Sequence, residues 1–299
     1  MCTVSDGWNS RRKWEIVTRT ENNGEAILPD IAATILAKIE EKKIDKAEVA
    51  GVGIGVPGPV EETGEIPCAV NLHWGRKNIE KELGDLTGLA VKAGNDANVA
   101  ALGEMWKGGG QGAKNLILVT LGTGVGGGII VNEKIVTGAH GAGGEIGHAF
   151  VNPAETKACN CGNKGCLEQY ASATGIARLA KEALESETED SVLRTVKNIS
   201  AKSVFDAYKE GDVLAGKIVD KFAAYLGNAL AVFACVSDPD VFVIGGGVSK
   251  AGQVLIDAVE KYYKAHAFTA SKETPIKLAT LGNDAGIYGA AKLILSKDN

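Results

Sequence analysis

The sequence lacks the features that would direct a chain to nucleic acid, to a membrane or out of the cell. No run of Lys and Arg forms a basic patch, and the net charge is −5, so nucleic acid is not an expected partner. The longest apolar run, 226–236, is too short to cross a bilayer. The first residues do not resemble a secretory signal. We therefore expect a cytoplasmic protein that does not bind membranes.

Cysteine is also scarce, with 6 in 299 residues, and a chain of this length has no need of disulfides for stability. A reducing cytoplasm would keep these thiols available for a metal. The sequence has no internal repeat of solenoid length. Its apolar content of 45% and its 39 glycines are typical of an enzyme with a large core and many tight turns. The length fits two domains or one large α/β domain.

One short stretch, 143–168, contains most of the metal-binding chemistry of the chain. Three of the six cysteines fall within eight residues, and Gly162 and Gly165 between them let the backbone fold back. With one histidine they form a set of soft ligands with no spare position, which is typical of a closed structural Zn²⁺ site: His148, Cys159, Cys161 and Cys166. The alternative is a group of free buried cysteines, which this clustering makes less favoured.

Two carboxylates flank these ligands. Glu145 precedes His148 by three residues, and Glu168 follows Cys166 by two. A metal that fixes the ligands would also fix where these carboxylates lie, and so would support a polar pocket without taking part in the reaction. The alternative for each Glu is a solvated surface charge.

Alternation of apolar segments and glycine turns predicts an α/β fold. Strands are predicted at 13–20, 49–56, 89–93, 240–244 and 276–281, with a further strand–turn–strand over 115–131. Helices are predicted at 27–43, 77–87, 99–106, 172–185, 201–210, 213–236, from about 252, and at 285–295. A flexible connector is predicted at 107–113, KGGGQGA.

Polar and glycine-rich turns follow several of these strands. Asn95 and Asp96 come between a strand and a helix, where α/β proteins place catalytic groups, although Asp96 could equally be a helix N-cap. Gly122, Gly124 and Gly127 have dinucleotide-fingerprint spacing, but the following residues predict a strand and not the required helix. A hairpin whose turn approaches a phosphate fits better, with a plain glycine-rich hairpin as the alternative.

The segments NDANVAALGE, LGTGVGGGI, GAGGEIGH and CNCGNKGCLE, in this order, resemble the ROK family of sugar kinases, and within it the bacterial ATP-dependent glucokinases. The resemblance extends from about residue 13 to the C-terminus and implies an actin-like, ribonuclease H-like fold of two lobes. The N-terminal lobe would comprise 1–113 and the C-terminal helix 285–297. The second lobe, with the zinc site, would comprise 114–284.

The resemblance also implies roles for individual residues. Asp96 would be the general base that accepts the proton of the sugar 6-hydroxyl, and ATP would act together with Mg²⁺. The sugar-binding residues would be Asn95, Glu145, His148 and Glu168. The nucleotide-binding residues would be Thr123, Gly124, Gly246 and Gly247. The expected substrates are glucose and ATP, and a homodimer is the expected assembly.

The sequence departs from the family pattern in one respect. Family members begin with two strands joined by an Asp-x-Gly-Gly-Thr phosphate loop, and these 299 residues contain no such motif. Asp6-Gly7 is the nearest fragment and is predicted to be an ordinary turn. The resemblance thus predicts an incomplete N-terminal lobe and little or no kinase activity. The alternatives are a kinase for N-acetylmannosamine or fructose, or a sugar-binding pseudoenzyme. A family repressor is not expected, because 1–12 is too short for a helix-turn-helix.

Overall fold

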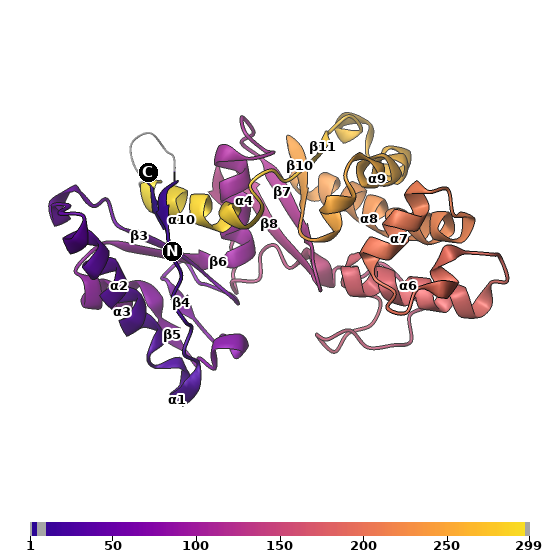
Figure 1. Ribbon diagram of the computed structural model, residues 1–299. Coiled ribbons are helices and arrows are strands. Elements are labelled where there is room, and N and C mark those ends of the chain that lie inside the picture. Colours follow the sequence, from indigo (N-terminus) through magenta and orange to yellow (C-terminus); the bar gives the residue numbers. More distant parts are fainter. Residues whose placement is uncertain (1, 5–9, 297–299) are drawn as a thin grey trace.

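The computed structural model describes residues 2–4 and 10–296, with side chains from Lys13 onward. The elements form two lobes that lie side by side, with helices α4 and α10 between them (Figure 1). Single-turn 3₁₀ helices connect the main elements: η1 Lys46–Glu48, η2 Val70–Leu72, η3 Ile146–His148, η4 Val192–Thr195, η5 Val248–Ala251, η6 Thr269–Ser271 and η7 Gly282–Asp284. Asp6 and Gly7, the predicted turn, and residue 297 of the predicted last helix lie outside the described residues.

The first lobe has a small parallel sheet covered by two helices. Its elements are β3 Val52–Val56, β6 Val91–Asn95, α2 Ile27–Glu41, α3 Ile79–Thr87 and the short antiparallel pair β4 Glu65–Ile66 and β5 Lys77–Asn78. Apolar residues of α2, β3 and α3 form its core, including Leu28, Val56 and Ile79. The predicted strand over 89–93 and helices over 27–43 and 77–87 are confirmed, each within a few residues.

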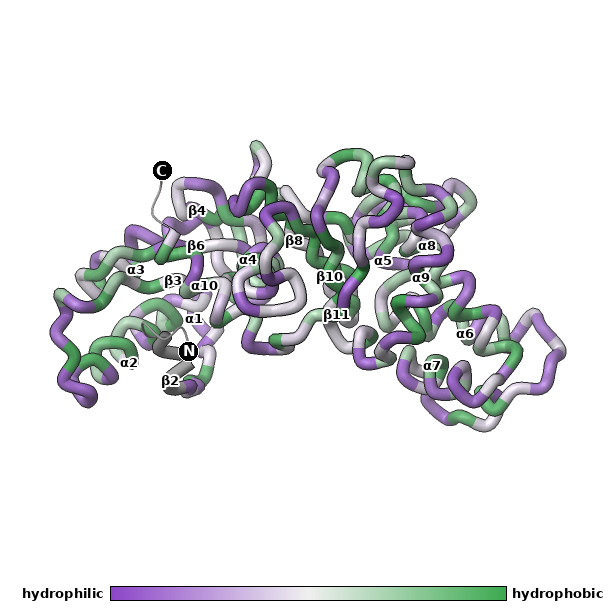
Figure 2. Tube along the Cα trace, turned by 90° about the horizontal axis from the view of Figure 1, so that it is seen from above, coloured by the Kyte–Doolittle hydropathy of each residue, from purple (hydrophilic) through white to green (hydrophobic). Residues whose placement is uncertain are grey.

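The second lobe is built on a five-stranded mixed sheet in the order β11-β10-β7-β8-β9. Its strands are β7 Leu116–Leu121, β8 Val125–Val131, β9 Lys134–Ile135, β10 Val241–Gly245 and β11 Ile276–Leu278. Strands β7 and β8 are antiparallel, which confirms the predicted hairpin at the glycine-rich stretch. In Figure 2 strands β8 and β10 are largely hydrophobic in colour, as expected for a sheet covered on both faces.

The two faces of this sheet contribute alternate residues to two cores. Ile117, Val119 and Leu121 face helices α5 Glu168–Ala171, α6 Ala173–Ser186, α7 Ala201–Lys209, α8 Val213–Ser237 and α9 Gln253–His266. Leu116 and Leu118 face the opposite way, toward α4 Asp96–Lys107. Helix α8 has the length and composition of a membrane span, but 56% of its most apolar window is buried inside the protein. It is therefore the central helix of this core.

Helices α4 and α10 (Ala285–Leu295) cross at very short range between the lobes. A methyl group at Gly289 would lie 1.7 Å from the carbonyl oxygen of Val99, and one at Gly103 would lie 2.0 Å from that of Ala285. Only glycine permits such contact between helix backbones, since any Cβ would push them apart.

The buried carboxylate of Glu104 on α4 fixes both connections between the lobes. The side chain is 1% exposed. Its oxygens accept hydrogen bonds from the backbone amides of Gly109 at 2.8 Å, Thr280 at 3.1 Å and Leu281 at 2.9 Å. The first amide belongs to the chain leaving α4 and the others to the chain returning to α10. The segment 107–113, predicted to be a flexible connector, is instead a hydrogen-bonded turn that the Glu104 carboxyl group holds in place.

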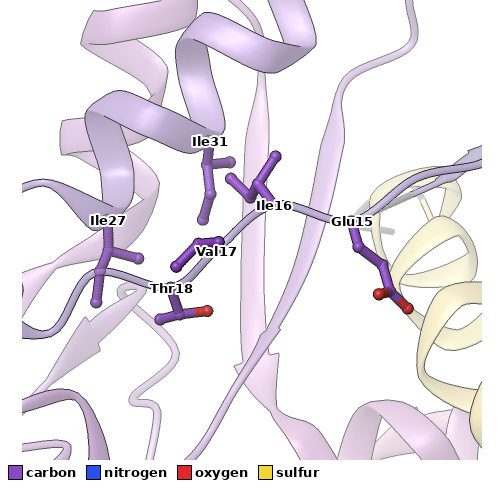
Figure 3. Close-up of a pocket in the computed structure, with 6 residues that line it drawn as sticks. All are labelled: Glu15, Ile16, Val17, Thr18, Ile27 and Ile31. Carbon is purple, nitrogen blue, oxygen red and sulfur yellow. The ribbon is translucent and has the colours of Figure 1, made fainter.

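The predicted strand over 13–20 is also wrong beyond its first residue. Strand β2 (Ser10–Lys13) pairs with β1 (Cys2–Val4), and residues 14–20 have no regular structure. They lie along α2, where Ile16 and Val17 meet Ile31 and Ile27 around a hollow of about 310 Å³ (Figure 3). Val17 remains 80% exposed. A strand needs a hydrogen-bonded neighbour, and among the described residues β3 pairs with β6 alone.

Candidate active site

Asn95 and Asp96 stand where β6 ends and α4 begins. The Asn95 side-chain oxygen accepts from the amides of Ala97 at 3.0 Å and Asn98 at 3.2 Å, and its amide group donates to the Gly58 carbonyl at 3.0 Å. Asn95 is thus the helix N-cap and also fixes the turn after β3. Asp96 is exposed and accepts from the Ala97 amide at 2.8 Å. Its second carboxylate oxygen has no partner among the described residues.

The two glycine turns that the sequence assigned to the nucleotide lie next to each other. The hairpin turn between β7 and β8 is closed by a 3.0 Å bond from the Gly122 amide to the Gly124 carbonyl. Gly246 follows β10 with φ +83°, and a Cβ there would lie 2.5 Å from the backbone of Leu121, just before that turn. Gly247 is exposed, with open space at its Cβ position. The backbones of the two turns therefore lie in direct contact.

The first turn of α4 packs directly on β8 and on the turn before Glu145. A Cβ at Gly126 would lie 3.7 Å from the Ala97 methyl group. The Asn98 side-chain amide lies 3.4 Å from the Gly143 carbonyl. This packing connects the first turn of α4, which carries Asp96, with the segment that carries Glu145. The buried Asn98 side-chain oxygen has no hydrogen-bond partner among the described residues.

The four predicted metal ligands come together in space. Their ligand atoms all lie within 4.8 Å of one another. The Cys161 and Cys166 sulfurs are 3.6 Å apart, and the Cys159 sulfur is 3.8 Å from His148 Nδ1. Ligand atoms on one tetrahedral zinc ion are about 3.3–3.8 Å apart, given bonds of about 2.0–2.3 Å. The donor set is that of a closed Zn²⁺ site, and the two spacings given above match it, whereas the widest pair, up to 4.8 Å apart, would draw together when an ion binds.

The thiols differ in how readily they ionise. Burial raises the pKa of Cys159 and raises the pKa of Cys166 to about 12. The backbone amide of Asn163 lowers the pKa of Cys161. A metal must displace protons from buried thiols to bind them as thiolates.

Glu145 and Glu168 have different surroundings. Glu145 is exposed, and its carboxylate lies 3.9 Å from His148 Nε2. Glu168 is half-buried on α5, where one oxygen accepts from the Val125 amide at 3.0 Å and the other lies 3.5 Å from the Cys159 sulfur. The Glu168 carboxylate therefore touches the metal cluster on one side and the hairpin between β7 and β8 on the other.

The start of α6 also supports that hairpin. The Thr174 hydroxyl donates to the Thr123 carbonyl at 2.7 Å, and the Ala173 amide donates to the Gly122 carbonyl at 2.8 Å. The exposed Thr123 side chain and the glycine amides are thus held on a fixed backbone. Polar groups fixed before a ligand binds need no reorganisation when it arrives.

The sequence did not single out Glu104, Glu155, Gln169, Tyr170 or Thr174, all of which make specific polar contacts around this site. For Glu104 a signal was present, since it is an acidic residue among the mostly apolar residues of α4. Tyr170 directly follows the Glu168-Gln169 pair, but its partners lie in an irregular loop whose path no periodicity describes.

Known proteins share both the sequence and the arrangement of these elements. The profile of the ROK family matches residues 3–297. This chain belongs to the ROK family. It is 44% identical over 292 residues to a glucokinase from Halalkalibacterium halodurans, covering 96% of this chain and 88% of that protein. It is 34% identical to an N-acetyl-D-glucosamine kinase from Haemophilus influenzae, covering 84% and 82%.

Solved structures of the family confirm the fold. The ROK family glucokinase from Streptomyces griseus, in complex with glucose and AMPPNP, superposes with a TM-score of 0.74 at 32% identity. The match covers 98% of this chain and 94% of that one. The predicted actin-like, two-lobed ROK fold is therefore confirmed, whereas the lobe boundaries at 113 and 284 remain a prediction.

Proposed function

We propose that this protein transfers the γ-phosphoryl group of ATP to the 6-hydroxyl of glucose. The contact that carries the proposal is that of Glu168, which meets both the metal cluster and the Val125 amide of the hairpin. The Glu168 carboxylate, a candidate sugar-binding group, thereby connects the candidate metal site with the candidate phosphate-binding turn. The ROK relatives named glucokinase support the choice of substrate.

Asp96 would act as the general base. Its backbone is fixed by the Asn95 cap, and one carboxylate oxygen remains available to the sugar hydroxyl. A base must lie within hydrogen-bond reach of the proton that it accepts. As the proton moves to Asp96, the hydroxyl oxygen would attack the γ-phosphorus, and the bond from that phosphorus to the β–γ bridging oxygen would break to release ADP.

Asn95, Glu145, His148 and Glu168 would bind the other sugar hydroxyls. Carboxylates accept hydrogen bonds from hydroxyl groups, and an analogue without the hydroxyl leaves a charged group unpaired. Because Glu168 already accepts from Val125, a hydroxyl would add to an existing network without moving it.

Thr123 and Gly124 would approach the phosphates, and Gly246 and Gly247 the adenosine. The open space at Gly247 and the glycines on either side of Thr123 allow close approach of a ligand to the backbone. Mg²⁺ bound with ATP would neutralise charge on the phosphates during transfer.

Zn²⁺ would be structural, held by His148, Cys159, Cys161 and Cys166. It would keep the loop that precedes Glu168 closed. His148 would use one ring nitrogen for the metal and lie beside the sugar with the other.

A panel of sugars in a coupled ADP assay, run on a protein that carries the phosphate loop of the family, tests the proposal. Glucose should give the highest kcat/KM, above N-acetylmannosamine, fructose and N-acetylglucosamine. The last sugar is included because a relative bears that activity in its name. A preference for another hexose would reassign the substrate, and turnover without any sugar acceptor would contradict the proposed reaction.

A second candidate, a sugar-binding protein without turnover, is favoured by the lack of an Asp-x-Gly-Gly-Thr motif in the 299 residues. Calorimetric titration with glucose and the ADP assay on the same sample separate the two. Binding without ADP release supports the second candidate. Binding with ADP release supports the kinase.

A further inference from the structure

Helix α5 is a single turn, and three consecutive residues of it hold three different segments. Glu168 accepts from Val125 of the hairpin, as described above. Gln169 contacts both arms of the irregular loop 152–166, and Tyr170 contacts the beginning of that loop. Successive residues of a helix point about 100° apart, so one short turn can hold three neighbours at once.

Gln169 joins the two arms of the loop. Its side-chain oxygen accepts from the Cys166 amide at 3.1 Å, and its side-chain nitrogen donates to the Lys157 carbonyl at 3.0 Å. Cys159 and Cys166 therefore belong to two chain segments whose separation is set by one planar amide group.

Tyr170 anchors the start of the loop by a hydrogen bond to the buried carboxylate of Glu155. Its hydroxyl donates to Glu155 at 2.6 Å and accepts from the Asn152 side chain at 2.7 Å. The Glu155 side chain is 7% exposed and lies 3.0 Å from the Arg178 guanidinium. Arg178 also lies over the Tyr170 ring and donates to the Gln169 carbonyl at 2.9 Å. A buried carboxylate satisfied by a cation and a hydroxyl strongly favours a single arrangement.

We infer that Gln169 and Tyr170 are positioning residues that hold the loop 152–166 closed on α5 without any metal, so that Cys159 and Cys166 already face each other when Zn²⁺ arrives. The inference rests on the proposed metal site. The contacts that support it involve no metal ligand side chain: they are made by an amide, a hydroxyl, a carboxylate and a guanidinium. Partners of this kind around a metal site typically change metal affinity about 10–100-fold when removed, because a preformed site does not have to be ordered on binding.

The test compares Tyr170→Phe with Tyr225→Phe. The Tyr225 ring stacks on Tyr170 at 4.0 Å, and its hydroxyl has no hydrogen bond among the described residues. Each variant thus removes one hydroxyl from the same aromatic pair, but only the first removes the contacts to the loop.

Hydrogen exchange on the metal-free protein is the first measurement. The amides to follow are those of Thr156 and Lys157, which donate to Glu155, and that of Cys166, which donates to Gln169. Tyr170→Phe should raise their exchange rates about tenfold or more, the lower end of the affinity effect above, and Tyr225→Phe should not. Equal rates in the two variants would overturn the inference.

Zinc affinity, measured by competition with a chromophoric chelator, is the second measurement. Tyr170→Phe should bind Zn²⁺ about 10–100-fold more weakly than Tyr225→Phe, and equal affinities would count against the inference. If Tyr170→Phe does not fold, both measurements are made on Gln169→Met. This variant removes the two side-chain hydrogen bonds to Cys166 and Lys157 at a half-buried position. If the unaltered protein binds no zinc, the proposed metal site fails, and the exchange rates still decide whether the loop is held by α5.

Discussion

Glu155 keeps its charge in a nearly closed environment. Burial raises its pKa, but the hydrogen bond from Tyr170, the amides of Lys157 and Thr156, and the charge of Arg178 outweigh this effect and lower the pKa to about 2. A carboxyl whose pKa falls on folding contributes stability above its unfolded pKa, near 4.5, and loses this contribution as the pH falls toward 2.

We therefore predict that Glu155→Gln lowers the free energy of unfolding at pH 7 by about 1–3 kcal/mol, the range for a hydrogen bond to a charged group. The difference from the unaltered protein should shrink steadily between pH 4.5 and pH 2. Urea unfolding of the metal-free proteins across this range measures it. Glu182→Gln is the matched control, since Glu182 also pairs with Arg178 at 3.0 Å but is 37% exposed, so it should cost roughly 0–1 kcal/mol.

Asp96→Asn should reduce turnover by about 10²–10⁴-fold if Asp96 is the general base. Glucose affinity should change little, because Asn95 and not Asp96 makes the contact to the Gly58 turn. Steady-state kinetics and glucose titration on one preparation measure both quantities, in a protein that carries the phosphate loop of the family. Near-full turnover in the variant would mean that Asp96 serves only the start of α4.

At this scale the sequence predicted which four candidate ligands come together better than it predicted their surroundings. His148 and the three cysteines could be recognised because their chemistry is rare and their spacing short. Glu155 and Gln169 could not, because their roles depend on a loop without periodicity that folds back on α5.

Among the elements, the crossing of α4 and α10 leaves the least space for a side chain. Gly289→Ala would place a methyl group 1.7 Å from the Val99 carbonyl oxygen, and forced separation of packed elements typically costs about 1–3 kcal/mol. Gly286→Ala on the same helix has nothing within 4 Å of its Cβ position and should be neutral or stabilise by up to about 1 kcal/mol. Thermal unfolding of the two variants separates the cost of the steric clash from the gain in helix propensity. Equal melting temperatures would show that α10 shifts to relieve the contact.

The metal loop provides a second prediction at the scale of elements. Purified protein should contain about one Zn²⁺ per chain. Cys161→Ala should lose it, melt at a lower temperature and bind glucose more weakly, because the loop leads directly into Glu168. Cys235→Ala, which removes another exposed cysteine, should keep zinc, stability and glucose affinity. Metal analysis and glucose titration of both variants give the answer; a zinc-free unaltered protein would refute the prediction.

Most of the helices and strands could be predicted, because long amphipathic helices and buried glycine-ended strands have strong periodic signals. The strand over 13–20 could not be judged from its alternation, because a strand also needs a neighbour and sequence periodicity does not reveal one. The turn over 107–113 was predicted to be flexible because its glycines allow many backbone conformations. The hydrogen bond that holds it comes from Glu104 on α4, which the local sequence of the turn does not reveal.

At the scale of the whole molecule, the proposed reaction would need both lobes to present donors to the phosphates. The family resemblance implies a phosphate loop of the Asp-x-Gly-Gly-Thr type, which these 299 residues do not contain. The removal of one preorganised donor costs about 10²–10³ in rate. We predict little or no glucokinase activity for the 299-residue chain, and its recovery when a strand–turn–strand with that loop is placed before Lys13. Parallel ADP assays decide this: full turnover without the added segment would mean that other residues bind the γ-phosphate.

The hydrogen bonds of Glu104 to both connecting segments also bear on how the chain could be recombined with other proteins. A Cβ at Gly109 would lie 2.4 Å from the Leu278 carbonyl oxygen, so the chain enters and leaves the larger lobe at the same point. A segment whose two ends touch can be joined to another chain without stretching the backbone, although its removal would expose Leu116 and Leu118, which pack against α4. The stretch 110–278 is thus one insertion between α4 and the chain that returns to α10. It carries the hairpin, the metal loop and their supporting helices together, and a recombination event could move all of them at once.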